Sequence, residues 1–333
     1  MQRLKLLAAA ALGVAVIATP VAAEPLKIKL QYATVGQFVP MIPLAPKELY
    51  RHYGKSYVVE PIFMAGAGPA ITAFAAGEVH LAALNPHSIT NAVISAKLDM
   101  RSIAQVLSTD VPGYAGGQYW CQDHIKTVAD LKGKTIAINT RGSTPEAAAR
   151  VYLRRHGLEP GRDYQPVEMP FPNSLPALDG KRVDCAVLVS PWVHQIASRP
   201  GVRMLFTIGE VMGPSESVTW VGNPDWVAKN RATLVDFLED HIRFRRWVMD
   251  PKTQPEAAKL AAQVAKQPVE RVAYLFTNKD NFHHPEAWID IARFQKNVDD
   301  LHKLGITPGR IEAKRYIDTS IQQEALARVN RGT

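Results

Sequence analysis

The sequence is poor in cysteine and has no long apolar segment after its first 23 residues. Two cysteines in 333 residues exclude a small scaffold held together by disulfides. Because 47% of the residues are hydrophobic, and the 24 Pro and 21 Gly follow no repeat, the chain is neither disordered nor collagen-like. What remains is an ordinary globular protein, long enough for two domains.

Motifs of the common catalytic and nucleotide-binding sites are also absent. The chain has no Gly-x4-Gly-Lys-Ser/Thr loop, no Gly-x-Gly-x2-Gly fingerprint, no Gly-x-Ser-x-Gly turn and no His-Glu-x2-His pair. The ten histidines show no metal-ligand spacing, and the adjacent His283 and His284 diverge on any helix or strand. We therefore expect no catalytic residue, no metal and no cofactor.

Acidic residues are outnumbered by basic ones, 31 to 39, which gives a net charge of +8. Such a charge suits nucleic acid, an anionic surface or acidic small molecules. The densest basic cluster, Arg243, Arg245 and Arg246, shares its predicted helix with Glu239 and Asp240. We interpret it as a solvated face and expect no nucleic-acid partner.

The first 23 residues have the pattern of a secretory signal peptide. Arg3 and Lys5 precede the apolar run 6–18, and small residues follow up to Ala23, after which we expect cleavage. A retained membrane anchor is the alternative, but the small-residue ending favours cleavage. Export would place Cys121 and Cys185 in an oxidising environment, where they form one bridge or remain two buried thiols.

Apolar runs that alternate with helical stretches predict an α/β fold around mostly parallel sheets. The predicted strands are Leu26–Tyr32, Tyr57–Met64, Val79–Leu84, Thr135–Asn139, Val183–Val189 and Arg203–Ile208. Residues 74–86 and 178–191 share a pattern of helix, Gly, apolar strand, polar residue and Pro, and a further candidate strand, 58–64 or 164–171, precedes each. This duplication predicts two similar α/β lobes, with chance similarity of βα units as the alternative.

The C-terminal third, from Pro224, is helical in pattern and is expected to pack on one lobe. Its predicted helices are Ala232–Met249, Gln254–Lys266, Pro285–Leu304 and Tyr316–Val329. The turn-rich segments 110–117 and 213–223 are the candidate crossings between the lobes. A chain that leaves the first lobe near Gly116 and returns near Trp220 would have two hinge strands and a cleft between the lobes.

Three predicted strands are followed by a polar residue, a proline and a helix, at Asn85-Pro86, Thr144-Pro145 and Ser190-Pro191. Such residues suit a helix start, and loops at the carboxyl ends of parallel strands line ligand crevices. Free N–H groups at these helix N-termini would bind an anion.

The loop 140–146 is the strongest of these cases. Arg141 brings charge, Gly142 allows close backbone approach, and Ser143 and Thr144 bring hydroxyls. A well-capped helix with an exposed Arg is the alternative interpretation.

Other candidate contacts have equally ordinary alternatives. The glycine-rich turn 64–69 is the first-lobe equivalent of loop 140–146, or simply a tight turn. Trp192 is an aromatic wall or a core anchor, and His87 contacts ligand or solvent.

Several segments together carry a family resemblance. They are 26–33, the stretch Ala75-Ala-Gly-Glu-Val-His-Leu-Ala82, the stretch Asp130-Leu-Lys-Gly-Lys-Thr-Ile-Ala-Ile-Asn139 with Arg141-Gly-Ser143, and Gly180-Lys-Arg-Val-Asp-Cys-Ala186. The chain resembles the nitrate/sulfonate/taurine-type substrate-binding proteins of bacterial ABC importers. The resemblance implies a type II periplasmic binding protein fold with two α/β lobes, two hinge strands and a helical C-terminal extension. Lobe 1 would comprise residues 24–115 and 221–333, and lobe 2 residues 116–220.

The resemblance also implies a ligand, partners and a location. They are a small organic anion of the sulfonate or carboxylate type, an ABC permease with its ATPase, and the periplasm, with the protein a monomer that meets the membrane only through the permease. Together with the loops above, it assigns ligand contact to Gly36, Gln37, Phe38, Ala65, Gly66, Ala67, Asn85, His87, Arg141, Gly142, Ser143, Thr144 and Trp192.

Two departures from the family pattern keep the ligand class open. His80 stands where the family often has Asp, and the insert 38–43 could reshape the pocket. A neutral heterocycle, as bound by related pyrimidine-precursor binders, therefore stays in view. So do two other functions, an enzyme on the same fold that acts on a small aromatic or heterocyclic compound, and a sensor for a membrane regulator.

Overall fold

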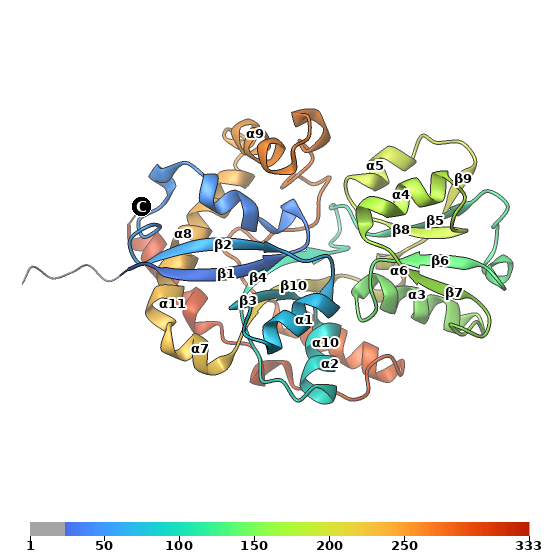
Figure 1. Cartoon of the computed structure of the whole chain (residues 1–333), viewed down its shortest axis with the longest axis horizontal. Coiled ribbons are helices and arrows are strands. Elements are labelled where there is room, and N and C mark those ends of the chain that lie inside the picture. The colour runs from blue at the N-terminus through green and yellow to red at the C-terminus, as the bar shows by residue number, and fades with distance from the viewer. Residues whose placement is uncertain (1–23, 333) are drawn as a thin grey trace, which may run out of the picture.

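The computed structural model describes residues 24–332, so the predicted signal peptide and its cut after Ala23 lie outside the described residues. Two five-stranded sheets form the two lobes of Figure 1. The first sheet contains β1 (Leu26–Tyr32), β2 (Tyr57–Phe63), β3 (Leu81–Leu84), β4 (Arg101–Thr109) and β10 (Ser215–Gly222). The second contains β5 (Gln118–Gln122), β6 (Thr135–Ile138), β7 (Gln165–Glu168), β8 (Cys185–Leu188) and β9 (Val202–Thr207).

Helices cover both sheets. Those between the strands are α1 (Ala67–Ala75), α2 (Pro86–Ser95), α3 (Thr144–Arg155), α4 (Phe171–Asp179), α5 (Trp192–Ile196) and α6 (Ile208–Met212). After β10 come α7 (Pro224–Lys229), α8 (Arg231–Met249), α9 (Gln254–Ala265), α10 (Ile291–Lys303) and α11 (Ser320–Arg331). None of the helices between residues 24 and 332 is long and apolar enough to cross a membrane.

The two sheets have the same topology. Their strand orders are β2-β1-β3-β10-β4 and β7-β6-β8-β5-β9. In each sheet three parallel strands are followed by one antiparallel strand, β10 or β5, which pairs on its far side with the last strand. The duplicated segments correspond to β2-α1-β3 and β7-α4-β8, so the predicted α/β fold of two similar lobes is confirmed.

The return crossing lies earlier than the sequence pattern placed it. β10 pairs with β3 and β4 in the first sheet from Ser215 onward, and Trp220 is completely buried there. The chain therefore re-enters the first sheet at Gly213-Pro214, before Trp220. β10 and its neighbour β4 are long strands that the sequence pattern did not identify.

The two cysteines form a disulfide, which resolves the two alternatives left by the sequence. Cys121 on β5 stands opposite Cys185 on β8 in the antiparallel register, with their Cα atoms 4.0 Å apart. Both side chains are buried in the second-lobe core.

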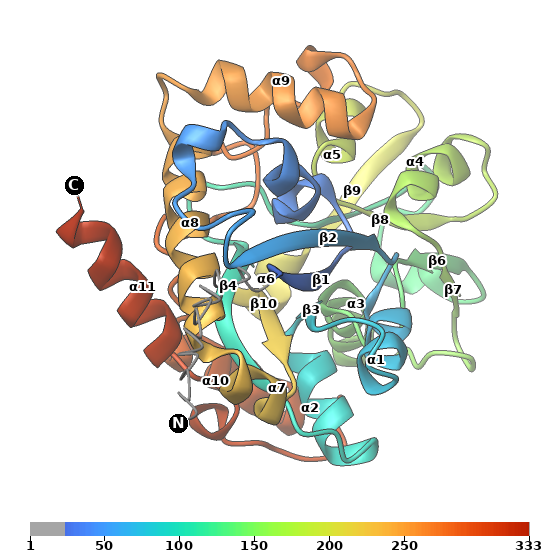
Figure 2. The ribbon, with the colours of Figure 1, turned by 60° about the vertical axis from the view of Figure 1, so that its left-hand side comes forward.

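The C-terminal helices pack mainly on the first lobe. Residues of α8, α9 and α11 share one core with the first sheet, and α11 lies along α8 (Figure 2). α10 packs on α2 and β10, but Leu301 at its end joins the second-lobe core, and the Arg154 guanidinium of α3 donates to the Leu304 carbonyl over 3.1 Å. The helical extension therefore contacts both lobes.

The expected solvated face on α8 is wrong. Arg245 and Asp240 are completely buried and Glu239 is 2% exposed. The Arg245 guanidinium lies over the Phe38 ring at 4.5 Å and donates to the Gln105 carbonyl over 3.1 Å, and burial lowers its pKa to about 9. Helical periodicity indicates on which face of a helix the charged residues lie, but it does not show whether distant segments of the chain bury that face.

Candidate functional site

Loops that follow β2, β3 and β6 meet between the two lobes. The Ser88 hydroxyl at the start of α2 donates to the Gly142 carbonyl before α3 over 2.7 Å. Gly66, with φ of +114°, lies so close to the opposite lobe that a Cβ atom there would be 2.9 Å from Thr140 Cγ2. Since these loops stand at the carboxyl ends of their strands, the structure brings together the loops that the sequence assigned to ligand binding.

The start of α2 is well capped and faces the other lobe. Asn85 Oδ1 accepts from the Ser88 N–H over 2.8 Å, as expected for a cap followed by Pro86. His87 is only 2% exposed, so it is not the solvated histidine of the alternative interpretation. Burial lowers the pKa of His87 to about 4, a hydrogen bond with the Ser143 backbone opposes this, and Arg150 adds to the lowering. A neutral imidazole therefore occupies the interlobe contact at pH 7.

α3 begins one residue earlier than the sequence pattern indicated. Its cap is Ser143, whose Oγ accepts from the Glu146 N–H over 3.2 Å and donates to the Thr140 carbonyl over 2.7 Å. Arg141 is exposed and pairs with Glu168 over 3.3 Å. The Ser143 hydroxyl and the Arg141 guanidinium thus have partners inside the second lobe. The half-buried Thr144 hydroxyl, in contrast, has no hydrogen-bond partner in the part of the chain that the structure describes.

A buried carboxylate lies in the first turn of α3. Glu146 is 6% exposed, and its Oε1 lies 3.4 Å from Arg150 Nη1. Burial raises the pKa of the Glu146 carboxyl, while Arg150 and the Gly142 backbone oppose the rise. One oxygen of this carboxyl has no hydrogen-bond partner within residues 24–332. The site therefore combines helix N-termini with a nearby acidic group, and its net charge is not strongly positive.

Three predicted contacts, Gly36, Gln37 and Phe38, lie in the first loop of the chain, and the structure gives them different surroundings. The Gln37 side chain accepts from the Ala33 N–H over 2.7 Å, and Gly36 faces Leu275 and Asp280. Phe38 is completely buried and stacks on Phe276 at 4.8 Å, so it belongs to the first-lobe core and does not line a cleft.

Three further expectations concern the insert 38–43, Trp192 and His80. The predicted insert 38–43 is largely buried in the first-lobe core. Trp192 is half-buried in the second lobe, where its ring stacks on Phe171 at 6.5 Å. His80 stacks on Trp226 at 4.7 Å and its Nδ1 accepts from the Lys29 N–H, so this departure from the family pattern lies before β3, away from the loops at the strand ends.

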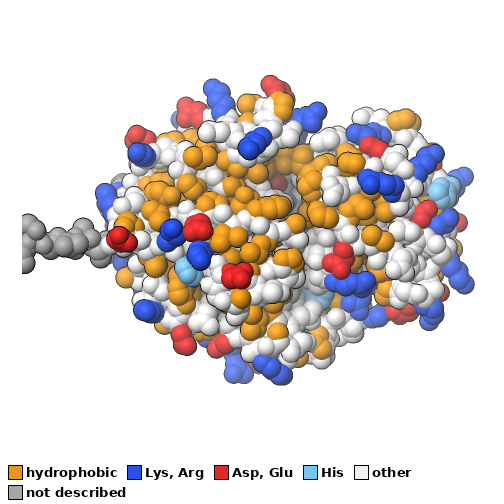
Figure 3. Space-filling view, viewed as in Figure 1, with side chains coloured by type: hydrophobic (Ala, Val, Ile, Leu, Met, Phe, Trp, Pro, Cys, Tyr) orange, Lys and Arg blue, Asp and Glu red, His pale blue; other side chains and the backbone are white. Residues whose placement is uncertain are grey.

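Sequence reasoning missed several residues of this region. Ser88 and Thr140 adjoin predicted residues, and their hydroxyls and position at a strand end were the available signal. Phe63, 60% exposed at the end of β2, and the neighbouring Tyr32 ring at 5.7 Å present an aromatic edge. Figure 3 shows hydrophobic side chains on both sides of the boundary between the lobes, with Lys and Arg mainly at the periphery.

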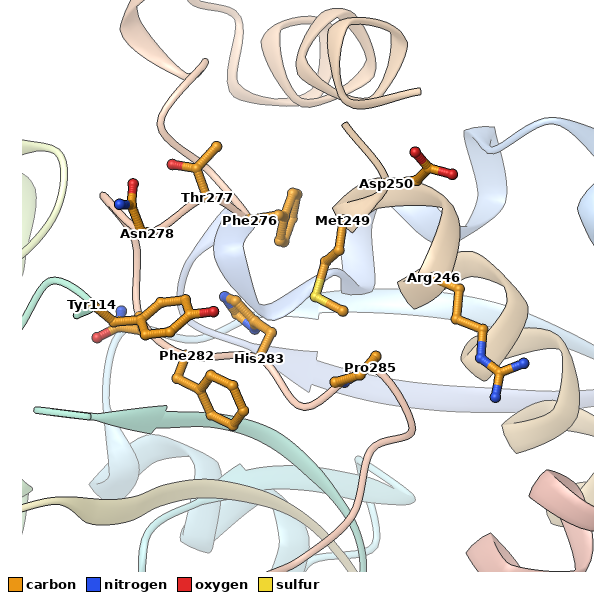
Figure 4. A pocket seen from close by; sticks show the side chains of 11 residues that line it. Tyr114, Arg246, Met249, Asp250, Phe276, Thr277, Asn278, Phe282, His283 and Pro285 are labelled. Atoms are coloured by element: carbon orange, nitrogen blue, oxygen red, sulfur yellow. The ribbon is translucent and has the colours of Figure 1, made fainter. Parts of the chain in front are cut away.

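A cavity of about 390 Å³ lies elsewhere, between α8 and the segment after α9. Tyr114, Phe276, Met249 and Phe282 surround it in Figure 4, and none of the predicted contacts lines it. A second depression, at the start of α11, likewise contains no predicted contact within the part that the structure describes. Among residues 24–332 no group of three or more His, Cys, Asp or Glu could hold a metal ion.

Comparisons with known proteins agree with this architecture. A model of the NMT1-like family matches residues 21–262, and no curated protein matches the chain. The alkanesulfonate-binding protein SsuA from Xanthomonas axonopodis pv. citri bound to MOPS is similar over 90% of this chain and 100% of its own, with 19% identity and a TM-score of 0.68. The periplasmic nitrate-binding protein NrtA from Synechocystis PCC 6803 is similar over 92% of this chain and 89% of its own, with 16% identity and a TM-score of 0.70.

A third solved structure has the same architecture. The periplasmic aliphatic sulphonate binding protein SsuA from Escherichia coli is similar over 89% of this chain and 92% of its own, with 19% identity and a TM-score of 0.61. At these identities the likeness shows the fold. The resemblance to nitrate- and sulfonate-type binding proteins is thereby confirmed, with the periplasmic binding protein fold that it implied.

Proposed function

The chain belongs to the NMT1-like family, and from this membership we propose that it is the periplasmic solute-binding component of an ABC importer. It captures a small organic anion between its lobes and delivers it to a membrane permease whose ATPase drives transport. The protein acts as a monomer without cofactor or chemical step. The sulfonates and MOPS named for two similar structures support an organic anion, and the nitrate named for a third supports an anion in general.

One observation carries the proposal. The N-termini of α2 and α3 come from different lobes and meet at the Ser88–Gly142 hydrogen bond of 2.7 Å. Backbone N–H groups at helix starts stabilise negative charge, and here two starts point to the same interlobe space. Near this point His87 contacts the Ser143 backbone and Gly66 packs on Thr140. The stacked rings of Trp192 and Phe171 offer an aromatic wall for the organic part.

The charges around the site limit the ligand further. The buried Glu146 carboxyl in the first turn of α3 opposes additional negative charge, and the positive charge of Arg150 only balances that of Glu146. We therefore favour a singly charged sulfonate or carboxylate with an apolar group over a multiply charged anion.

We assign residues 24–115 and 215–332 to the first lobe and residues 116–214 to the second. Residues 215–220, expected in the second lobe from the sequence, go to the first because β10 pairs in the first sheet from Ser215. Rotation about the two crossings opens the cleft. A ligand that contacts both lobes binds the closed arrangement more tightly and so increases its population.

A thermal-shift screen of the exported protein tests the proposal. The compounds are aliphatic and aromatic sulfonates, carboxylates, nitrate, bicarbonate and pyrimidines. A compound at a hundred times its dissociation constant adds about 2.7 kcal/mol to the free energy of unfolding. We expect a sulfonate or carboxylate to raise Tm, and Thr144→Val to reduce the shift, while Thr72→Val on the exposed face of α1 leaves it unchanged.

Two results would contradict the proposal. A shift with pyrimidines alone would replace the anion by a neutral heterocycle. If chromatography shows that a compound is converted to product during incubation, the enzyme alternative would be favoured.

A further inference from the structure

A segment of the C-terminal extension packs in the first lobe and also contacts the second. Residues Tyr274–Asn281, called the strap below, follow α9 and contain no helix or strand. The Ser190 hydroxyl of the second lobe donates to the Lys279 carbonyl over 2.9 Å, and His194 Nε2 on α5 lies 2.9 Å from the same oxygen. The Tyr274 and His194 rings are 5.9 Å apart. The strap thus touches the second lobe at two points.

The strap is folded around one buried carboxylate. Asp280 is 3% exposed, and its Oδ2 accepts from the Phe276 N–H over 3.0 Å while its Oδ1 accepts from the Asn281 N–H over 2.8 Å. His283 Nε2 lies 3.2 Å from the same Asp280 Oδ2. These bonds hold the Lys279 carbonyl in a defined direction, toward the second lobe.

The strap is also fixed to the hinge. The Ala115 N–H of the first crossing donates to the Asp280 carbonyl over 3.0 Å. Directly after the strap, Phe282 exchanges two backbone hydrogen bonds with Ser108, at the end of β4 where that crossing begins. When the lobes rotate about this crossing, the hydrogen bonds of the Lys279 carbonyl with Ser190 and His194 must break, or the strap must move together with the second lobe.

Space for movement exists on the outer side of the strap. The cavity of about 390 Å³ is lined by Phe276, Thr277, Asn278 and Asn281 of the strap and by Tyr114 of the first crossing (Figure 4). On its inner side the strap packs on Gly36, whose Cβ, if present, would lie 3.4 Å from Leu275 Cδ2. The strap thus connects a predicted ligand loop, the hinge and the second lobe.

We propose that the strap is a latch which holds the lobes closed, with Ser190 and His194 as the positioning residues that engage it. The inference rests on the proposed function, because a latch on closure governs how long a ligand stays in the cleft. The latch acts in the protein without ligand, so that part of the population is closed before any ligand binds.

The interlobe distance in the ligand-free protein tests the latch. Spin labels on Lys259→Cys of α9 and Asn173→Cys of α4 lie on exposed positions of the two lobes on the strap side (Figure 1). Their distance distribution reports the closed and open populations. We expect Ser190→Ala with His194→Ala to lower the ratio of closed to open molecules about tenfold, since two hydrogen bonds to one carbonyl are lost.

Two variants separate the latch from a general loss of structure. His194→Gln keeps an N–H donor near the position of Nε2, so alone it should retain the wild-type distribution. His156→Ala removes an exposed histidine of the same lobe whose Nδ1 contacts only the Tyr152 carbonyl of its own helix, and should change nothing.

The outcomes distinguish the latch from the proposed function. An unchanged distribution in the double alanine variant, or a wild-type protein found only in the open arrangement, overturns the latch even if a sulfonate or carboxylate raises Tm in the screen. A shifted distribution with rescue by His194→Gln supports the latch even if no compound of the screen binds.

Discussion

Replacing Gly66 by Ala is expected to push the two lobes apart more than it unfolds either of them. Gly66 has φ of +114° and ψ of 170°, a conformation open almost only to glycine, at the start of α1. Its missing Cβ also makes room for Thr140 of the opposite lobe. The substitution therefore acts twice, once on the backbone of the first lobe and once on the contact between the lobes.

The two costs are of similar size but apply to different states of the protein. The backbone cost is about 1–3 kcal/mol and applies whether the lobes are open or closed. The added Cβ would lie 2.9 Å from Thr140 Cγ2 and 3.1 Å from Thr140 Cβ. Because this contact crosses the boundary between the lobes, we expect opening of the lobes to relieve it. Overpacking of this kind costs about 1–3 kcal/mol, which lowers the ratio of closed to open molecules at least about fivefold.

Denaturant unfolding and the interlobe spin-label distance measure the two costs separately. Gly66→Ala should lower the free energy of unfolding and shift the distance distribution toward the open arrangement. Adding Thr140→Ser removes the nearest methyl group but keeps the hydroxyl bonded to Glu168, so it should partly restore the distance and leave the unfolding cost in place.

The control lies two residues away. Gly68 is the second residue of α1, its φ lies outside the left-handed region, and a Cβ added there would meet no atom of another described segment within 4 Å. Gly68→Ala should therefore leave the distance distribution unchanged, and it should not lower the free energy of unfolding, because Ala favours a helix over Gly. The reasoning is refuted if Gly66→Ala leaves the distance distribution unchanged, or if Thr140→Ser restores none of it.

Three further predictions concern buried groups. The pKa of His87 falls from an ordinary 6.5 to about 4, so stability present above pH 6.5 is lost as the pH falls toward 4, and His87→Gln should flatten that limb of the urea-unfolding profile. Burial raises the pKa of Glu216, which is 0% exposed, from an ordinary 4.5 to about 8, so stability is lost as the pH rises between these values. Glu216→Gln should remove this loss, and an unchanged slope of unfolding free energy against pH would contradict the prediction. Replacing both Cys121 and Cys185 by Ala should cost about 4 kcal/mol, because the bridge closes a loop with a separation of 64 residues; a loss below about 1 kcal/mol by calorimetry would show that the bridge contributes little.

Strands covered by helices could be predicted from the sequence because burial on both faces requires continuous apolar runs. β3, β6 and β8 have such runs, whereas β1, β2 and β9 combine apolar with charged or polar residues, and all six lie close to their predicted bounds. β4 and β10 carry Gln105, Ser108, Glu216 and Ser217, which are buried and polar. Gln105 accepts from Arg245 of α8 and from the His284 N–H after α9, and Ser108 donates to Glu216 on the neighbouring strand. Because these partners are distant in the chain, a local pattern could not show that the two strands are buried.

The candidate site was predictable as a set of loops but not as a set of contacts. Capping residues and proline identified the helix starts at Asn85 and near Thr144, because a helix N-terminus imposes local rules. Phe38 could not be assigned to the core from its loop, since its neighbours Phe276 and His283 lie more than 200 residues away in the chain. The same holds for Ser190 and Lys279, which are in contact although they lie 89 residues apart in the chain.

Binding between the lobes is the central claim, and hydrogen exchange with and without a compound selected by the thermal-shift screen tests it most directly. The account predicts slower amide exchange in loops of both lobes at once, 64–67 and 85–88 of the first and 139–144 of the second. Protection confined to one lobe, protection only around the cavity at 276–285, or no compound that binds at all would contradict it.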